Sequence, residues 1–259
     1  MAETRFQTAL VTGASSGLGR GLALWYARQG VRVYAAARRR ENLEALAQEA
    51  RAAGGHLEPV ELDVSQGDET VARIRELDDA CGGLELIIAN AGFGQDSPAK
   101  RIQWESVRQT LGVNVTGAAA TLCAVLPRMV ERGRGHVVGV ASLAAFRGLP
   151  RQAAYSGSKA FLHIFMESLR VDLRGTGVGV TCVYPGFVKS EMTSQNKFPM
   201  PFLLETEDAV ARMAGAIARG EAEYAFPWQM AGVLGVVKRL PNPLYDALAR
   251  KARTPAPKK

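Results

Sequence analysis

The chain has 259 residues and a mass of 27.8 kDa, enough for a large core but hardly for two full domains. Hydrophobic residues make up 47% and charged residues 22%, which excludes a largely disordered protein, a fibre and a disulfide-stapled mini-protein. The net charge of +7 is concentrated from Lys238 onwards, because residues 1–237 hold 25 basic and 24 acidic residues. A body this neutral argues against nucleic acid as the main partner, since phosphate binding requires a basic face.

The cysteines and the longest uncharged stretch bear on the cellular compartment. Cys81, Cys123 and Cys182 are odd in number and far apart, which favours a reducing compartment over a secreted disulfide framework. The first six residues lack the apolar core of a signal peptide. The stretch Tyr224–Val237 contains Pro227 and is shorter than the roughly 20 apolar residues of a membrane span. We therefore expect a cytoplasmic protein.

Short apolar runs alternate with longer stretches of helical spacing along most of the chain. Most runs are rich in Val, Ile or Leu without polar alternation, as in parallel strands buried on both faces. This alternation predicts a doubly wound α/β sandwich with about seven parallel strands and helices on both faces. The expected strands are Thr8–Val11, Val31–Ala36, Leu57–Leu62, Leu84–Ala89, His136–Val140, Val178–Val183 and Tyr224–Phe226. The expected helices include Glu41–Ala53, Trp104–Glu131 and Ala153–Leu173.

A glycine-rich turn, TGASSGLG at residues 12–19, follows the first expected strand and leads into a helical pattern. Glycines at such a turn bend the chain tightly, let the backbone approach a pyrophosphate and bring helix and strand together. The helix N-terminus offers free N–H groups and a partial positive charge to phosphates. The glycines alone also fit a tight turn without a ligand, but their place after the first strand favours a dinucleotide site. A P-loop is excluded, because no Gly-Lys-Ser/Thr follows.

The loop spacing Gly-x-x-x-Gly-x-Gly, preceded by Thr12, resembles that of the short-chain dehydrogenase/reductase family. Further family motifs follow in order over roughly residues 6–226: Asp63-Val64, Asn90-Ala91-Gly92 and Pro185-Gly186, after the third, fourth and sixth strands. The resemblance implies a Rossmann-type fold in which Asp63 and Val64 touch the adenine ring and Val188 meets the nicotinamide carboxamide. Ser190 departs from the family's usual Thr but keeps its hydroxyl.

The end of the second strand bears on the choice of dinucleotide. An NAD site usually has an acid there to accept hydrogen bonds from the ribose 2′-OH. Here the strand continues into Arg38-Arg39-Arg40 with no acid before Glu41, and guanidinium groups suit a 2′-phosphate. We expect NADP(H), with Arg38 and Arg39 as ligands, a Ser15 hydroxyl added as in NADP-dependent relatives, and Arg40 solvated. The expected cofactor-binding residues are Gly13, Ser15, Ser16, Gly17, Leu18, Gly19, Arg38, Arg39, Asp63, Val64, Asn90, Ala91, Gly92, Tyr155, Lys159, Pro185, Gly186 and Val188.

Tyr155 and Lys159 are four residues apart in an expected helix and so share one face of it. An ammonium group beside a phenol stabilises the phenolate and lowers its pKa from about 10, which makes the tyrosine a usable acid or base. Ser142, just beyond the fifth strand, can donate a hydrogen bond to a substrate oxygen. With Asn114, these residues match the spacing of the family's catalytic tetrad. That match implies that Lys159 bonds the nicotinamide ribose and that Asn114 holds a water linking Lys159 to solvent.

Other chemistries find less support. A Tyr-x-x-x-Lys pair alone is often a surface pair, but Ser142 and the glycine loop reverse that reading. His56, His136 and His163 lack metal-ligand spacing, so we expect no metal site and a core role for His163. A non-catalytic dinucleotide sensor on the same fold remains the alternative, although the complete tetrad argues against it. An epimerase or dehydratase would need a longer C-terminal substrate domain.

The loops at the carboxyl ends of the strands should choose the substrate. Their apolar residues favour a hydrophobic ketone, aldehyde or alcohol, or they merely pack the lid of the pocket. The candidates are Phe93, Leu143, Ala144, Phe146, Leu149, Met192, Phe198, Met200, Phe202 and Leu203. We expect one domain over 1–259, with a substrate loop and helix at about 187–220 and a basic, flexible tail at 250–259.

Two surfaces suggest partners. Apolar residues lie on more than one face of the helices around Val107–Val130 and Ala153–Leu173, and the resemblance implies a homodimer or homotetramer through a two-fold helix bundle. The apolar stretch Tyr224–Val237 beside the basic run can lie on an anionic membrane surface. The favoured interpretation of that stretch is instead a seventh strand and a helix closing the pocket, with solvated charges.

Overall fold

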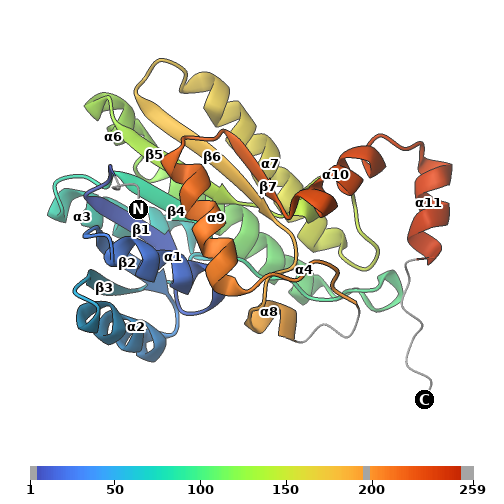
Figure 1. Cartoon of the computed structure of the whole chain (residues 1–259), viewed down its shortest axis with the longest axis horizontal. Helices are drawn as coiled ribbons and strands as arrows, with labels where there is room; N and C mark the ends of the chain where they lie inside the picture. Colours follow the sequence, from blue (N-terminus) through green and yellow to red (C-terminus); the bar gives the residue numbers. More distant parts are fainter. Residues whose placement is uncertain (1–4, 195–198, 252–259) are drawn as a thin grey trace.

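The seven expected strands form one parallel sheet in the computed structural model, which describes residues 5–194 and 199–251 (Figure 1). The order β3-β2-β1-β4-β5-β6-β7 reverses its winding direction between β1 and β4. The Rossmann-type doubly wound fold is thus confirmed, and each strand lies within two residues of its expected bounds. The strands are β1 Thr8–Thr12, β2 Arg32–Ala37, β3 His56–Glu61, β4 Leu86–Ala89, β5 Gly135–Val140, β6 Val178–Pro185 and β7 Glu223–Phe226.

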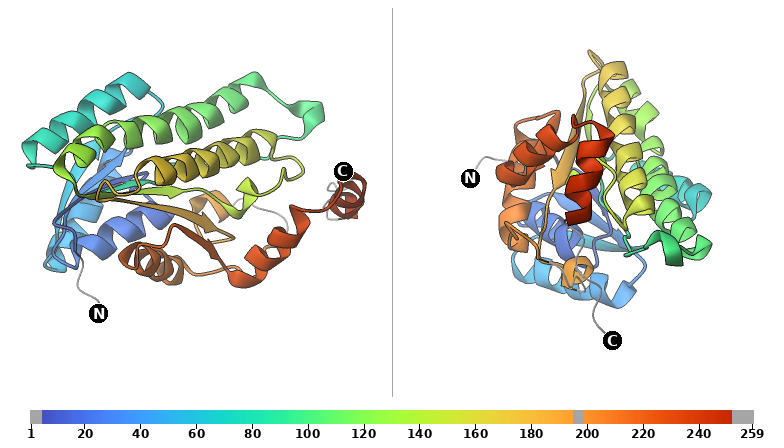
Figure 2. Two further views of the ribbon diagram at one scale, coloured as in Figure 1. Left: turned by 90° about the horizontal axis from the view of Figure 1, so that it is seen from above. Right: turned by 90° about the vertical axis from the view of Figure 1, so that its right-hand side faces the viewer.

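Helices cover both faces of the sheet (Figure 2). Because the strands are buried on both faces, each face has its own apolar cluster. One face carries α1 Gly17–Ala27, α2 Arg40–Ala52 and α9 Thr206–Ala218. The other carries α3 Gly67–Ala80, α4 Trp104–Leu111, α5 Ala118–Cys123, α6 Leu126–Arg132 and α7 Ala153–Asp172.

The single long helix expected over Trp104–Glu131 is wrong. The structure has α4, then a π-helical turn η2 (Gly112–Gly117), then α5 and α6, with a break at Val125. Two glycines and β-branched residues weaken the α-helix in the turn, and Pro127 begins the last piece. The stretch has the length and hydropathy of a membrane span, but 44% of its most apolar part is buried against the rest of the protein, as in a core helix.

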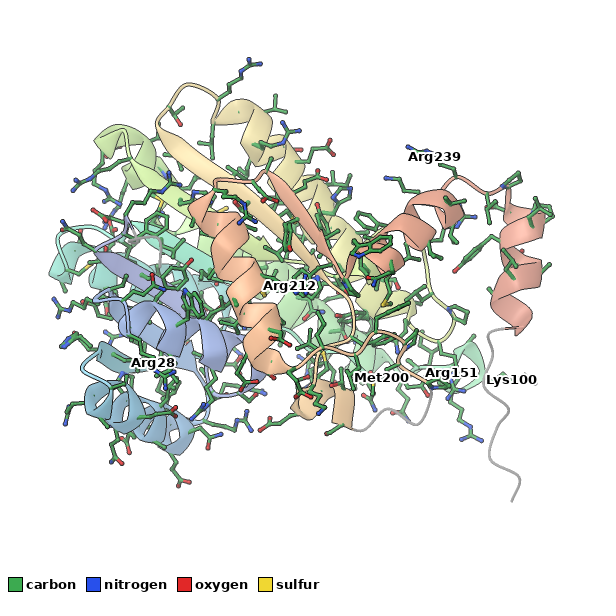
Figure 3. All side chains as sticks on the ribbon, in the orientation of Figure 1. Arg28, Lys100, Arg151, Met200, Arg212 and Arg239 are labelled. Atoms are coloured by element: carbon green, nitrogen blue, oxygen red, sulfur yellow. The ribbon has the colours of Figure 1, made fainter. Side chains whose placement is uncertain are left out.

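The remaining elements lie at the carboxyl ends of the strands. They are the 3-10 turns η1 Ala99–Arg101 and η3 Leu143–Ala145, and the helices α8 Glu191–Ser194, α10 Trp228–Val237 and α11 Asn242–Lys251. Figure 3 shows Lys100, Arg151 and Arg239 at this end of the molecule and Arg28 at the other. The expected tail at 250–259 begins inside α11, so its first two residues are helical, and 252–259 lie outside the described residues.

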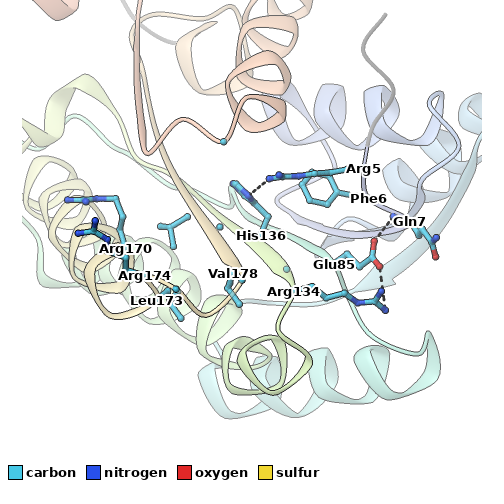
Figure 4. A pocket seen from close by; sticks show the side chains of 16 residues that line it. Arg5, Phe6, Gln7, Glu85, Arg134, His136, Arg170, Leu173, Arg174 and Val178 are labelled. Carbon is cyan, nitrogen blue, oxygen red and sulfur yellow. Dashed lines mark hydrogen bonds and ion pairs between the residues drawn. The ribbon is translucent and has the colours of Figure 1, made fainter.

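A cavity of about 810 Å³ lies at the opposite edge of the sheet, where the strands begin (Figure 4). At its centre the imidazole of His136 is buried between the guanidinium of Arg5, 3.0 Å from Nδ1, and the hydroxyl of Thr181, 2.8 Å from Nε2. Arg170 and Arg174 point away from this pair in the figure. Burial and the charge of Arg5 lower the pKa of His136 to about 4.

This shift predicts that the protein loses stability as the pH falls from 6.5 to 4. In that range the unfolded chain binds a proton that folded His136 does not, which costs about 3 kcal/mol of unfolding free energy over the whole window. Urea unfolding at pH 7 and pH 5 measures the slope. The His136→Gln variant, which cannot titrate, should show a flatter slope; equal slopes would contradict the prediction.

Candidate active site

The glycine loop packs tightly against the end of β4, the neighbour of β1 in the sheet. Gly13 has a φ of +68°, and a Cβ there would lie 2.7 Å from Cα of Ala91, while a Cβ at Gly19 would lie 2.3 Å from the carbonyl oxygen of Gly13. Only glycine fits at either position. The glycines therefore leave the loop backbone at the start of α1 uncovered, at the point between β1 and β4 where the sheet changes its winding direction. An uncovered backbone at such a point is what the binding of a dinucleotide pyrophosphate requires.

Thr12 and Asn90 hold the loop to β4, and sequence reasoning gave no role to Thr12. Its hydroxyl accepts hydrogen bonds from the backbone N–H groups of Asn90 (3.1 Å) and Ala91 (3.2 Å). The Asn90 amide donates in return to the Thr12 carbonyl at 2.9 Å. The reciprocal bonds fix Asn90-Ala91-Gly92 beside the loop, and the family's Thr in front of the glycines was the signal for this contact.

Arg39 reaches the glycine loop from the end of β2. Its Nε and Nη2 lie 3.2 and 3.0 Å from the hydroxyl of Ser15. Arg38 is exposed at the same strand end, whereas Arg40 pairs with Glu44 on its own helix, as expected for a solvated residue. Of the expected 2′-phosphate ligands Ser15, Arg38 and Arg39, the structure thus brings Ser15 and Arg39 into contact.

The expected adenine contacts follow β3. Asp63 accepts bonds from the backbone N–H of Ser65 (3.0 Å) and from its hydroxyl (2.8 Å), which closes the turn after the strand. Val64 is buried at the same turn.

Ser142, Tyr155 and Lys159 converge beyond the carboxyl end of β5. Ser142 lies beside the phenol of Tyr155 and acts to lower its pKa, and the Ser142 hydroxyl donates to the carbonyl of Pro185 at 3.4 Å. Lys159 Nζ lies 5.9 Å from the centre of the Tyr155 ring. The buried Lys159 donates to the carbonyl of Val140 at 2.8 Å, on the last residue of β5. Gly94 allows this packing, because a Cβ there would lie 2.8 Å from Cδ2 of Tyr155.

Burial dominates the electrostatics of the pair. It lowers the pKa of Lys159 to about 8 and raises the pKa of Tyr155, against which Ser142 acts. The lowered Tyr155 pKa expected from its spacing to Lys159 is therefore wrong for this structure, because desolvation of the phenol raises that pKa. Tyr155 is protonated at neutral pH.

Asn114 lies in the π-helical turn and is buried. Its amide donates to the carbonyl of Phe93 (2.8 Å) and to the hydroxyl of Ser158 (2.9 Å), while its Oδ1 accepts from the N–H of Phe93 at 2.7 Å. Both amide hydrogens are thus used in joining the loop after β4 to α7. The side chain has the geometry of a residue that positions the segment around Tyr155.

The segment after β6 forms the other wall of the site. Pro185 ends β6, the N–H of Gly186 donates to Phe226 of β7, and buried Val188 pairs with Leu204. A smaller cavity of about 380 Å³ follows, lined by Lys189, Ser190, Thr193, Ser194, Met200 and Leu203.

The expected substrate-lining residues differ in exposure. Leu143 and Ala144 are buried, Phe93, Phe146, Leu149, Met200 and Leu203 are half-buried, and Met192 and Phe202 are exposed. Phe198 lies outside the described residues.

His163 takes part in an aromatic cluster beside the site. Its Nδ1 lies 2.7 Å from the hydroxyl of Tyr184, and Phe146 packs edge-on against its ring. Among the residues that the structure describes, no three His, Cys, Asp or Glu side chains are close enough to hold a metal ion.

The C-terminal helices border the same end. Met230, Ala231 and Leu234 of α10 pack against the core, while Trp228, Val233 and Val236 are exposed on its outer face. Arg147, which sequence reasoning missed, holds α10 and α11 against the loop after β5. Its guanidinium donates to the carbonyl of Lys238 and to the side chain of Asn242, and lies 4.4 Å from the ring centre of Tyr245.

A parallel sheet with a glycine cradle at its winding reversal, and a Ser–Tyr–Lys cluster beside it, defines a dinucleotide-dependent oxidoreductase. The chain belongs to the short-chain dehydrogenase family, whose model matches residues 7–199. An uncharacterized oxidoreductase of Myxococcus xanthus is 66% identical over 253 residues, which cover 98% of this chain and all of that protein.

Two solved short-chain dehydrogenases share the fold along nearly the whole chain. That of Sphingobium yanoikuyae, in complex with NADPH, is 26% identical with a TM-score of 0.80 and covers 97% of this chain and 98% of its own. That of Burkholderia phymatum, in complex with NAD, is 25% identical with a TM-score of 0.82 and covers 99% of both chains.

Proposed function

We propose that the protein is an NADP(H)-dependent oxidoreductase that interconverts a carbonyl and an alcohol on an apolar substrate, with Tyr155 as acid and base. The observation that carries this proposal is the convergence of Ser142, Tyr155 and Lys159 beyond the carboxyl end of β5, with Lys159 Nζ 5.9 Å from the centre of the Tyr155 ring. That cluster lies beside the loop after β4, which Thr12 and Asn90 tie to the glycine cradle. This arrangement supports acid–base chemistry next to a bound dinucleotide.

The chain's own residues divide the work. Ser142 donates to the substrate oxygen as negative charge develops there, and Tyr155 transfers a proton to or from that oxygen. Lys159 holds the ribose of the cofactor and supplies positive charge near the phenol. Asn114 holds the loop after β4 to α7 through Phe93 and Ser158. The cofactor, held by the glycine loop, Asn90 and Val188, supplies or accepts the hydride.

Preference for NADP(H) is supported by the Arg39–Ser15 contact and by the lack of an acid before Glu41 at the end of β2. An apolar substrate is supported by the side chains around the cluster, of which Leu143 and Phe146 follow Ser142 directly. The inner face of α10 adds Met230, whose sulfur would lie 3.1 Å from a Cβ at Gly186.

An NADPH-consumption screen over aliphatic, aromatic, lipid-like and sugar carbonyls tests the proposal, with NADH in parallel. We expect turnover with NADPH on at least one apolar class. Tight NADPH binding without turnover on any class would instead favour a dinucleotide-sensing protein.

We also propose a homo-oligomer built through α4 and α7. Leu111 of α4 and Ile164 of α7 are exposed. Phe161 and Phe165 of α7 are half-buried and their rings are stacked on each other. A two-fold contact would remove this apolar surface from water. Light scattering at micromolar concentration should give the mass of a dimer or tetramer; a mass near 27.8 kDa would contradict the proposal.

A further inference from the structure

Glu191, the first residue of α8, contacts the expected cofactor ligands from the far side of the site. Its carboxylate takes both terminal nitrogens of Arg39, with Nη1 to Oε1 at 3.1 Å and Nη2 to Oε2 at 2.9 Å. Arg39, and to a smaller extent Ser16, lower the pKa of this carboxyl. These partners are 152 and 175 residues away in sequence, so the contact is made only by the fold.

The Arg39 fork is the group expected to hold the 2′-phosphate. A guanidinium binds a carboxylate or a phosphate through the same pair of parallel N–H donors, so one fork cannot be fully engaged by both. Nη2 and Nε already share the Ser15 hydroxyl, which leaves the outer edge of the fork for an anion. In this structure the Glu191 carboxylate occupies that edge.

The backbone holds Glu191 in this place. The preceding residue, Ser190, packs on the glycine loop, because a Cβ at Gly17 would lie 3.3 Å from its Cβ. Thr193 then bonds back to the Val188 carbonyl at 2.7 Å, closing the turn from which α8 starts. The side chains of Arg39 and Glu191 are 47% and 62% exposed, so their pairing is weak enough for an incoming anion to displace.

We infer that Glu191 is a specificity-determining residue that competes with the cofactor's 2′-phosphate for Arg39. This inference rests on the proposed use of NADP(H). Glu191 lowers the affinity for NADP(H) without affecting that for NAD(H), which has no group for the fork. The carboxylate thus makes the difference between the affinity for NADP(H) and the affinity for NAD(H) smaller.

The Glu191→Gln variant tests the inference through dissociation constants for NADPH and NADH, measured by fluorescence titration. We expect NADPH to bind about three- to tenfold more tightly and NADH to change less than twofold. Glu205→Gln is the matched control, because it removes one carboxylate from the same segment whose partner is Lys189. It should leave the affinities for both cofactors within twofold of wild type.

The double variant Arg39→Gln/Glu191→Gln separates competition from general charge repulsion. In the Arg39→Gln background, the Glu191 substitution should no longer tighten NADPH. Unchanged or weaker NADPH binding by Glu191→Gln would overturn the inference, as would equal gains from Glu191→Gln and Glu205→Gln. Wild-type protein that binds both cofactors equally would instead contradict the proposed NADP(H) preference itself.

Discussion

Replacement of Tyr155 by phenylalanine should lower turnover about 10²–10⁴-fold while NADPH still binds. The phenol lies beside Ser142 and can exchange a proton with the substrate oxygen, and general acid–base catalysis contributes on this scale. Steady-state kinetics on a substrate found by the carbonyl screen measure the loss, and fluorescence titration measures the cofactor. Near wild-type turnover would contradict the proposed mechanism.

Tyr224→Phe is the matched control, because it removes a tyrosine hydroxyl from a residue of β7 that packs on the other face of the sheet from α7. It should keep its turnover. The wild-type protein should also oxidise alcohols faster as the pH rises, since burial raises the pKa of Tyr155 above its usual value of about 10 and the base form becomes more populated with increasing pH.

Neutralising Arg38 and Arg39 together should weaken NADPH about 100-fold and NADH little. Each hydrogen bond to a charged group contributes about 1.5–3 kcal/mol, and the 2′-phosphate is the only part of NADPH that NADH lacks. Cofactor titrations of the Arg38→Gln/Arg39→Gln variant measure both affinities.

Arg40→Gln is the control for charge, since Arg40 pairs with Glu44 and faces Glu61 on the exposed side of α2. Its cofactor affinities should match those of wild type. A parallel loss of NADH and NADPH binding by the double variant would show that the arginines support the loop rather than select the phosphate.

The strands and the glycine loop could be predicted from sequence because their signals are local. Uninterrupted apolar runs such as Leu86–Ala89 can only be parallel strands or short buried helices, and the loop's spacing is set by a backbone that approaches itself. The convergence of Ser142, Tyr155 and Lys159 was predicted from spacing and family resemblance, and their contacts now lie within one site.

What sequence missed depends on contacts between distant segments. The π-helical turn keeps an apolar pattern, so Gly112–Gly117 read as ordinary helix. The direction of the Tyr155 pKa depends on desolvation, which no spacing reveals. The Glu191–Arg39 contact joins segments on opposite sides of the site. Arg39 was expected as a cofactor ligand, but nothing in the sequence around Glu191 indicated a role for that residue.

The π-helical turn has a consequence for how the chain tolerates length changes. A π turn holds one residue more than an α-helix needs, and each α-helical residue rotates the chain by about 100°. Deleting one residue within Gly112–Gly117 would leave α5 with its buried Leu122 still facing the sheet, but would carry the Asn114 amide away from Phe93 and Ser158. A deletion inside α5 would instead turn Leu122 out of the core. The surplus residue therefore sets the direction of the Asn114 amide, toward the loop after β4 and toward α7.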